Sequence, residues 1–129
     1  MMIDILSSVS KTMKHCGMAK GIRKDIHGHV CLLGGFDEVA KKLTDSCMGD
    51  CVFHQEIRAV VDTIKKSKKF APRLLDFDEY NRVYPLKASG VDINIVAGFN
   101  NHKDTTLSDV LLVLRRTRAR LKKREKKSP

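Results

Sequence analysis

Apolar residues recur at intervals of three and four positions along several stretches of the chain, the spacing typical of amphipathic helices. The first stretch consists of Ile5, Leu6, Val9 and Met13. Asp4 stands at its start as a capping residue, and Gly17 stands just past its end, where helices commonly stop. The pattern predicts a first helix of about three turns between these two residues.

Residues 18–23 and 30–33 form two short runs that contain apolar side chains, with a polar connection around Gly28 between them. Gly28 can supply the positive φ that a tight turn needs, so the two runs predict a β-hairpin. Gly34 and Gly35 are expected to end its second strand.

Helical spacing returns twice in the middle of the chain. The apolar positions that carry it are Phe36, Val39, Ala40 and Leu43, and then Phe53, Ile57, Val60, Val61 and Ile64. They predict a second helix over residues 36–44 and a third that ends near Lys66.

The pattern is less regular between residues 70 and 104. Pro72 and Pro85 interrupt residues 70–90, where an ordered but irregular segment is expected. Residues 91–95 alternate like a strand, although this run is too short to exclude a helical turn. A polar loop is expected over residues 100–104.

Thr106 and Asp109 approximate a capping box, with aspartate in place of the usual glutamate. They predict a last helix that begins at Leu107 and keeps contact with the core as far as Leu121. The predicted fold class is therefore α+β and mostly helical, with about four helices and one short β-hairpin. Residues 1–121 are expected to form a single compact domain, and residues 122–129 a basic tail that extends the last helix.

The distribution of charge adds a functional expectation. Nine of the last 15 residues are basic and only Glu125 is acidic, so this segment carries a net charge of +8, while the rest of the 129-residue chain carries +2. A nearly neutral body with a strongly basic end is typical of a protein that meets a polyanion. The expected contact residues are Arg115, Arg116, Arg118, Arg120, Lys122, Lys123, Arg124, Lys126 and Lys127.

Composition narrows the class of protein. An apolar fraction of 42% and a charged fraction of 31% are typical of a globular protein and exclude a collagen-like or disordered chain. No apolar run approaches the roughly 20 residues that span a bilayer, and residues 1–10 lack the order of a secretory signal. Residues 118–129 hold only Ala119 and Leu121 as apolar residues, so nucleic acid is favoured over a membrane as the polyanion. A cytoplasmic protein with four free thiols is expected.

Three segments carry a resemblance to a known family. Residues 28–35, 99–101 and 105–111 read GHVCLLGG, FNN and TTLSDVL. They resemble a small family of uncharacterised domains of bacteria and bacteriophages, which pairs a Cys-x-x-Gly segment with an aromatic-Asn-Asp loop before a Thr-capped helix. Gly35 stands where that family usually has alanine, and Asn101 where it usually has aspartate. The resemblance implies an accessory protein of a bacterium or phage, with a helix and hairpin core, located in the host cytoplasm if a phage encodes it.

A zinc site is one interpretation of the cysteines. Cys47, Cys51 and His54 place three suitable ligands within eight residues, and Cys16 or His15 could supply a fourth. Structural zinc sites usually take a pair of ligands at each end, and the second pair is absent here. The favoured alternative is that Cys51 and His54 lie at the start of a helix, and no metal or cofactor is expected.

His27, His29 and Cys31 alternate, so a strand would place them on one face. A metal triad, or a Cys31 thiol nucleophile activated by a nearby imidazole, is one interpretation. The favoured alternative is that Cys31 packs between Val30 and Leu32 as a small buried residue, because no triad motif supplies an aspartate.

Asn100 and Asn101 could bind a ligand or organise the entrance to the last helix, and the structural use is favoured. Gly34 and Gly35 could admit a phosphate to a helix N-terminus, but they lack the spacing of known phosphate loops, and two acidic residues follow them. Nucleotide binding through these glycines is not expected.

Three hypotheses follow for function. The favoured one is a non-enzymatic accessory protein whose basic C-terminal helix contacts nucleic acid or a nucleoprotein assembly. The second is an inhibitor or adaptor that binds a host protein through residues 70–84. The third is a small thiol enzyme or ligand-binding domain that uses Cys31, His29 and the Asn100–Asn101 loop.

Overall fold

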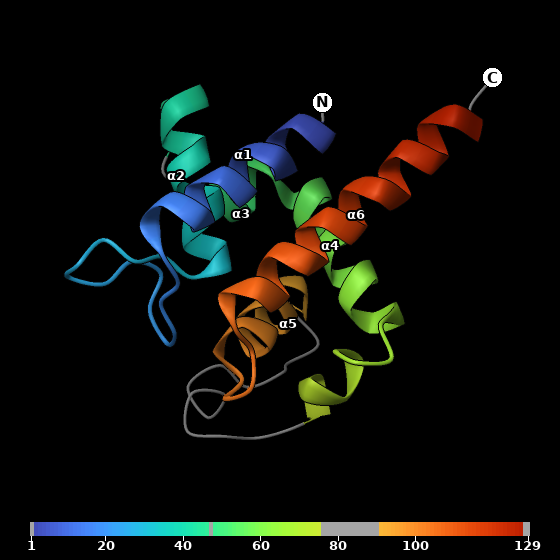
Figure 1. Ribbon diagram of the computed structural model, residues 1–129. Coiled ribbons are helices and arrows are strands. Elements are labelled where there is room, and N and C mark those ends of the chain that lie inside the picture. The colour runs from blue at the N-terminus through green and yellow to red at the C-terminus, as the bar shows by residue number, and fades with distance from the viewer. Residues whose placement is uncertain (1, 47, 76–90, 128–129) are drawn as a thin grey trace.

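The computed structural model describes residues 2–46, 48–75 and 91–127. Within these ranges, the regular elements are helices, coloured along the chain in Figure 1. They are α1 (Met2–Cys16), α2 (Leu32–Leu43), α3 (Gly49–Val52), α4 (His54–Lys66), a 3-10 helix η1 (Ala71–Leu75), α5 (Val91–Asn101) and α6 (Leu107–Lys127).

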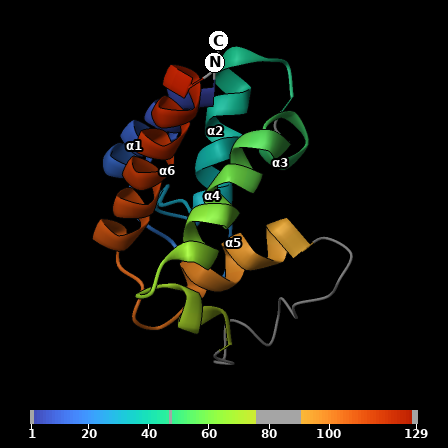
Figure 2. The same ribbon diagram turned by 90° about the vertical axis from the view of Figure 1, so that its right-hand side faces the viewer.

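Helix α6 is the longest element and packs against both α1 and α4. Helix α1 also covers α2, and α5 packs against α4, α2 and η1. Figure 2 shows α1 and α6 side by side, with α5 crossing the lower end of α4. The core contains three fully buried phenylalanines, of which Phe70 and Phe99 meet edge to face at 5.2 Å between ring centroids. Among the described residues, the helices supply most of the core, and the connecting segments add further residues such as Val30 and Phe70.

The prediction of an α+β fold with a β-hairpin is wrong. Among the described residues, β-pairing is limited to two isolated bridges, which join Val30 to Met18 and to Lys24. The Val30 carbonyl accepts a hydrogen bond from the Ala19 amide at 3.0 Å, and the Cys31 amide donates to the Arg23 carbonyl at 3.0 Å. Pairing cannot extend further, because Cys31 already caps α2.

Helix α2 begins at Leu32, four residues before the predicted start, so Gly34 and Gly35 lie in its first turn. The Cys31 thiol accepts a hydrogen bond from the Gly34 amide at 3.3 Å and closes that turn. A Cβ atom at Gly34 would lie 1.9 Å from the Arg23 carbonyl oxygen, so only glycine fits beneath the loop. Gly34 therefore allows the loop around Arg23 to pack closely against α2.

Residues 91–101 are helical, so the expected strand-like run and the first two residues of the expected polar loop, Asn100 and Asn101, belong to α5. Ile95, Val96, Ala97 and Phe99 are all buried. A helix that is apolar on nearly every side has no contrast between faces, so its periodicity cannot be read from the sequence.

The predicted capping box of α6 is confirmed. The Asp109 amide donates to Thr106 Oγ1 at 3.2 Å, and the Thr106 amide donates to Asp109 Oδ2 at 3.1 Å. Leu121 is buried as expected, and α6 continues without a break through the predicted boundary at residues 121–122 to Lys127.

Across the part of the chain that the structure describes, no helix is both long enough and apolar enough to cross a membrane.

Candidate nucleic-acid interface

Helix α6 has one buried face and a larger basic face. Its buried residues are Val110, Val113, Leu114, Thr117 and Leu121. The exposed basic residues are Arg115, Arg116, Lys122, Lys123, Arg124 and Lys126, while Arg118 and Arg120 are half-buried and the side chain of Lys127 lies outside the described part. The buried positions keep a helical spacing of three and four, so the cations around them must face the surface.

Two threonines fix α6 to α4. The hydroxyls of Thr63 and Thr117 lie 2.8 Å apart in the core, and Thr117 Oγ1 lies 2.7 Å from the Val113 carbonyl oxygen that it can donate to. The Arg120 guanidinium donates to Thr63 Oγ1 at 3.2 Å, so this predicted contact residue also supports the fold. Sequence reasoning missed this contact, although a threonine at an apolar position of α6 was a signal.

Several basic residues of the body form ion pairs with nearby carboxylates. Arg23 bridges Asp37 and Asp50 at 3.0 and 3.1 Å. Arg73 donates to Asp109 at 2.9 Å, and Lys69 lies 3.4 Å from the same carboxylate. In these pairs the positive charge is balanced locally.

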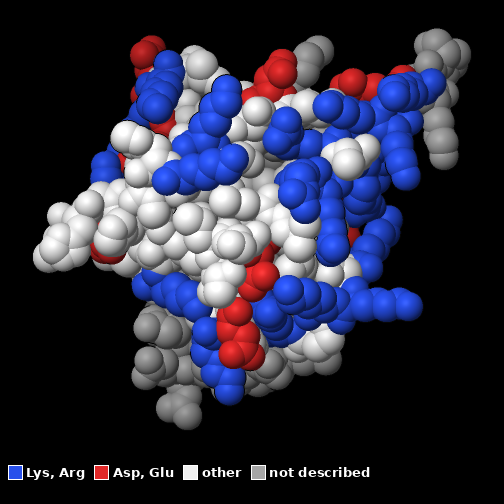
Figure 3. Space-filling model, in the orientation of Figure 1, with Lys and Arg blue, Asp and Glu red and all other residues white. Residues whose placement is uncertain are grey.

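The basic residues of α6 have a different environment. Among the described residues, no carboxylate forms an ion pair with Arg115, Arg116, Arg118, Lys122, Lys123 or Lys126. Lys65, Lys66 and Lys68, at the end of α4 and just past it, are also exposed. Figure 3 shows basic side chains gathered along the α6 side of the molecule. Helix α6 thus presents an unneutralised basic surface held on a rigid support.

The residues of the thiol-enzyme hypothesis do not form a catalytic arrangement. Cys31 is 7% exposed, and burial raises the pKa of its thiol, although hydrogen bonds from the Gly34 and Leu33 amides oppose this effect. His29 is exposed, and its Nδ1 lies 3.0 Å from Asp25 Oδ2. No hydrogen bond among the described residues joins Cys31 to an imidazole. Cys31 caps α2 and packs in the core.

Asn100 and Asn101 are buried and tie the loop of residues 17–31 to α5. Asn100 accepts from the Leu32 amide at 3.0 Å and donates to the Ala19 carbonyl at 3.0 Å. Asn101 Oδ1 accepts from the Gly21 amide at 2.9 Å. Both amides therefore satisfy backbone groups of the loop and of the start of α2. Their role is structural, but they lie within α5 and do not form the entrance to the last helix that was expected.

Two of the three zinc candidates lie in the described part of the chain. Cys51 is exposed on α3, and His54 is exposed at the first residue of α4. Cys47 lies outside the described residues. Within the described ranges, no three side chains of metal-ligating type come together.

In comparisons with protein-family models, with curated proteins and with solved structures, nothing matches this chain.

Proposed function

We propose that this protein binds nucleic acid through the phosphate backbone, using the basic surface of α6. The observation that carries the proposal is the set of basic side chains on α6 that no carboxylate neutralises, held on a helix whose other face is anchored in the core. Arg115, Arg116, Lys122, Lys123 and Lys126 are the principal contacts. Binding of these cations to phosphates releases condensed counterions and provides affinity without reading bases.

The arrangement favours backbone contact over base recognition. The cations surround the exposed part of α6 instead of forming one narrow stripe, so several orientations can reach phosphates. The described phenylalanines are buried and offer no stacking platform, and Tyr80 and Tyr84 lie outside the described residues. The expected binding is sensitive to salt and weakly dependent on sequence.

In this proposal the protein is a non-enzymatic accessory factor of a bacterium or bacteriophage that works in the cytoplasm on nucleic acid or a nucleoprotein assembly. The resemblance of residues 28–35 and 105–111 to phage and bacterial domains supports the origin. The buried, protonated state favoured for Cys31 supports a role without thiol catalysis.

The test compares two charge-matched triple variants in binding to a short DNA duplex and to a single strand across a series of salt concentrations. One variant replaces Lys122, Lys123 and Lys126 with Gln. The control replaces Lys11, Lys41 and Lys42, which are exposed on α1 and α2. Each lost phosphate contact lowers the magnitude of the salt slope by about 0.7 to 0.9, so the α6 variant should lose about 2 to 3 and the control little.

Two outcomes would reject the proposal. One is that the wild-type protein fails to bind either nucleic acid at low salt. The other is that the two variants lose the same affinity and slope, because this would show a dependence on total charge alone. In either case the basic end of α6 would be assigned to protein docking or to solubility.

A further inference from the structure

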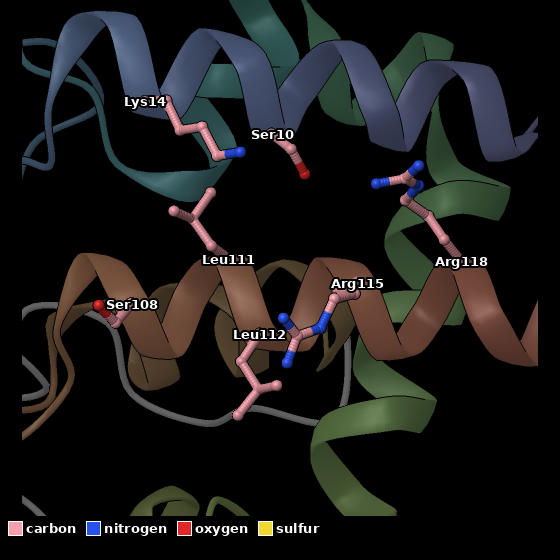
Figure 4. A pocket seen from close by; sticks show the side chains of 7 residues that line it. All are labelled: Ser10, Lys14, Ser108, Leu111, Leu112, Arg115 and Arg118. Carbon is pink, nitrogen blue, oxygen red and sulfur yellow. The ribbon is translucent and has the colours of Figure 1, made fainter.

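A groove of about 440 Å³ runs between α1 and α6. Figure 4 shows Lys14 and Ser10 projecting from α1 toward α6, and Leu111 and Arg118 projecting from α6 toward α1. Arg115 also lines the groove, together with Leu112 and Ser108. Basic, hydroxyl and leucine side chains from two helices thus line the same groove.

The three basic groups of the groove have no acidic counterpart. Among the described residues, no ion pair involves Lys14, Arg115 or Arg118, and no Asp or Glu lines the groove. Like charges gathered in a concave site repel one another, and a bound anion would relieve that repulsion. The groove is therefore complementary to a compact anion.

Arg118 provides a second and independent observation. Its Nε atom is buried and has no hydrogen-bond partner within the described part of the chain. A buried donor without an acceptor is unfavourable, so Arg118 keeps unused hydrogen-bonding capacity beside the groove. An arginine placed only for solubility would extend into water and avoid that cost.

We propose that the α1–α6 groove is a phosphate-binding site, in which Arg118, Arg115 and Lys14 hold one phosphate group and the Ser10 hydroxyl donates to it. The inference rests on the proposed function, because a strand bound along α6 would supply this phosphate from its backbone. Leu111 and Leu112 then contact the sugar or base next to it. A free mononucleotide offers the same phosphate chemistry, and the test separates the two sources.

The direct readout is the NMR resonance of the Arg118 Nε–H group in the full-length protein. Inorganic phosphate, adenosine monophosphate and a short oligothymidylate are titrated separately, each against sodium chloride of equal ionic strength. A backbone-binding groove predicts that the oligonucleotide shifts this resonance at the lowest concentration. If adenosine monophosphate binds more tightly than the oligonucleotide, the groove is a nucleotide site and the backbone assignment is wrong.

The matched variants are Lys14→Gln with Arg118→Gln, and Lys11→Gln with Lys42→Gln. Both remove two positive charges and each alters one lysine of α1, but Lys11 and Lys42 line a different pocket, between α1 and α2. The groove variant should bind the oligonucleotide at least about tenfold more weakly than wild type, as expected from loss of two charge-assisted hydrogen bonds. The control should change by less than about threefold.

Arg118→Lys separates geometry from charge. Lysine keeps the charge but lacks the planar fork of donors, so binding should stay weakened in this variant. Wild-type affinity in Arg118→Lys, an unchanged Nε–H resonance, or equal losses in the two double variants would each overturn the groove assignment. Phosphate binding at Arg118 is measured without nucleic acid, so it can fail while the α6 triple variant still supports nucleic-acid binding, and the reverse can also occur.

Discussion

The basic residues of the body and those of α6 differ in what surrounds them. Arg73 lies beside Phe70 and Thr105 and forms a 2.9 Å ion pair with Asp109, with only 13% of its side chain exposed. Arg116 is exposed on α6, and no described carboxylate pairs with it. One arginine helps to build the fold, and the other is available to an external anion.

This comparison shows why net charge alone is an incomplete guide to function. A cation that is buried with a carboxylate is needed by its partner, since removal of one member leaves the other unpaired. A cation at the surface with no partner adds little to stability and favours association with anions. Substitutions within the body should therefore lower the free energy of unfolding, whereas substitution of an unpaired cation of α6 should leave it nearly unchanged.

The largest effect is expected for Gly34→Ala. The new Cβ would lie 1.9 Å from the Arg23 carbonyl oxygen, and this displaces the loop that also positions the Arg23 guanidinium. The free energy of unfolding should fall by at least about 3 kcal/mol in chemical denaturation, or the protein should fail to fold. The control is Gly35→Ala, whose Cβ meets the flexible Met13 side chain at 3.0 Å and should cost far less. Equal stability of the two variants would contradict the close approach of loop and helix.

Asn100→Ala should cost about 3 kcal/mol. It leaves the Leu32 amide and the Ala19 carbonyl buried without their side-chain partner. Thermal and chemical unfolding should both show the loss, while the salt slope of nucleic-acid binding by the folded variant should match that of wild type. A stable variant that has lost binding would instead assign Asn100 to a ligand site.

Asp109→Asn should lower the free energy of unfolding by about 2 kcal/mol at neutral pH. Burial alone would raise the pKa of Asp109, but hydrogen bonds from Arg73 and the Thr106 amide, and the charges of Arg73 and Lys69, hold this pKa below its usual value. A lowered folded-state pKa means that the carboxylate stabilises the fold above its unfolded-state pKa of about 4, and that this stabilisation is lost as the pH falls through the lower folded value.

The measurement is the difference in unfolding free energy between wild type and Asp109→Asn from neutral to acidic pH. The difference should shrink as the pH falls below about 4, where the unfolded-state carboxyl becomes protonated, and should be lost through the lower folded-state pKa. A difference that stays constant with pH would show that Asp109 acts through packing and not through its charge.

A smaller loss of stability, about 1 kcal/mol, is expected for Cys31→Ala, because it removes one helix cap and a small buried group. Alkylation of the native protein should be fast at the exposed Cys51 and slow at Cys31, whose pKa is raised by burial. Rapid modification of Cys31 would restore the thiol-enzyme hypothesis.

The sequence predicted the helices that are determined by residues close together along the chain. The apolar spacing placed the first helix, the helix that ends at Lys66 and the last helix, and the Thr106–Asp109 capping box set the start of the last one. Each of these elements depends on residues within about one or two helical turns of one another. A single sequence is enough to detect patterns of this kind.

The remaining features depend on contacts between distant segments. Gly34 requires glycine because of the Arg23 carbonyl, and a glycine pair after an apolar run is otherwise typical of a strand end. The Thr63–Thr117 contact joins residues 54 positions apart. The groove likewise exists only because α1 packs beside α6, so Lys14 carried no signal of its own in the sequence.

The division between paired and unpaired cations is tested most directly by Arg73→Gln and Arg116→Gln, each measured for unfolding free energy and for the salt slope of duplex binding. Arg73→Gln should lose about 2–3 kcal/mol of stability and keep the wild-type slope. Arg116→Gln should stay within about 0.5 kcal/mol of wild type and lower the magnitude of the slope by about 0.7 to 0.9. An unchanged slope in Arg116→Gln, or an equal loss of slope in both variants, would contradict the assignment of α6 as the nucleic-acid interface.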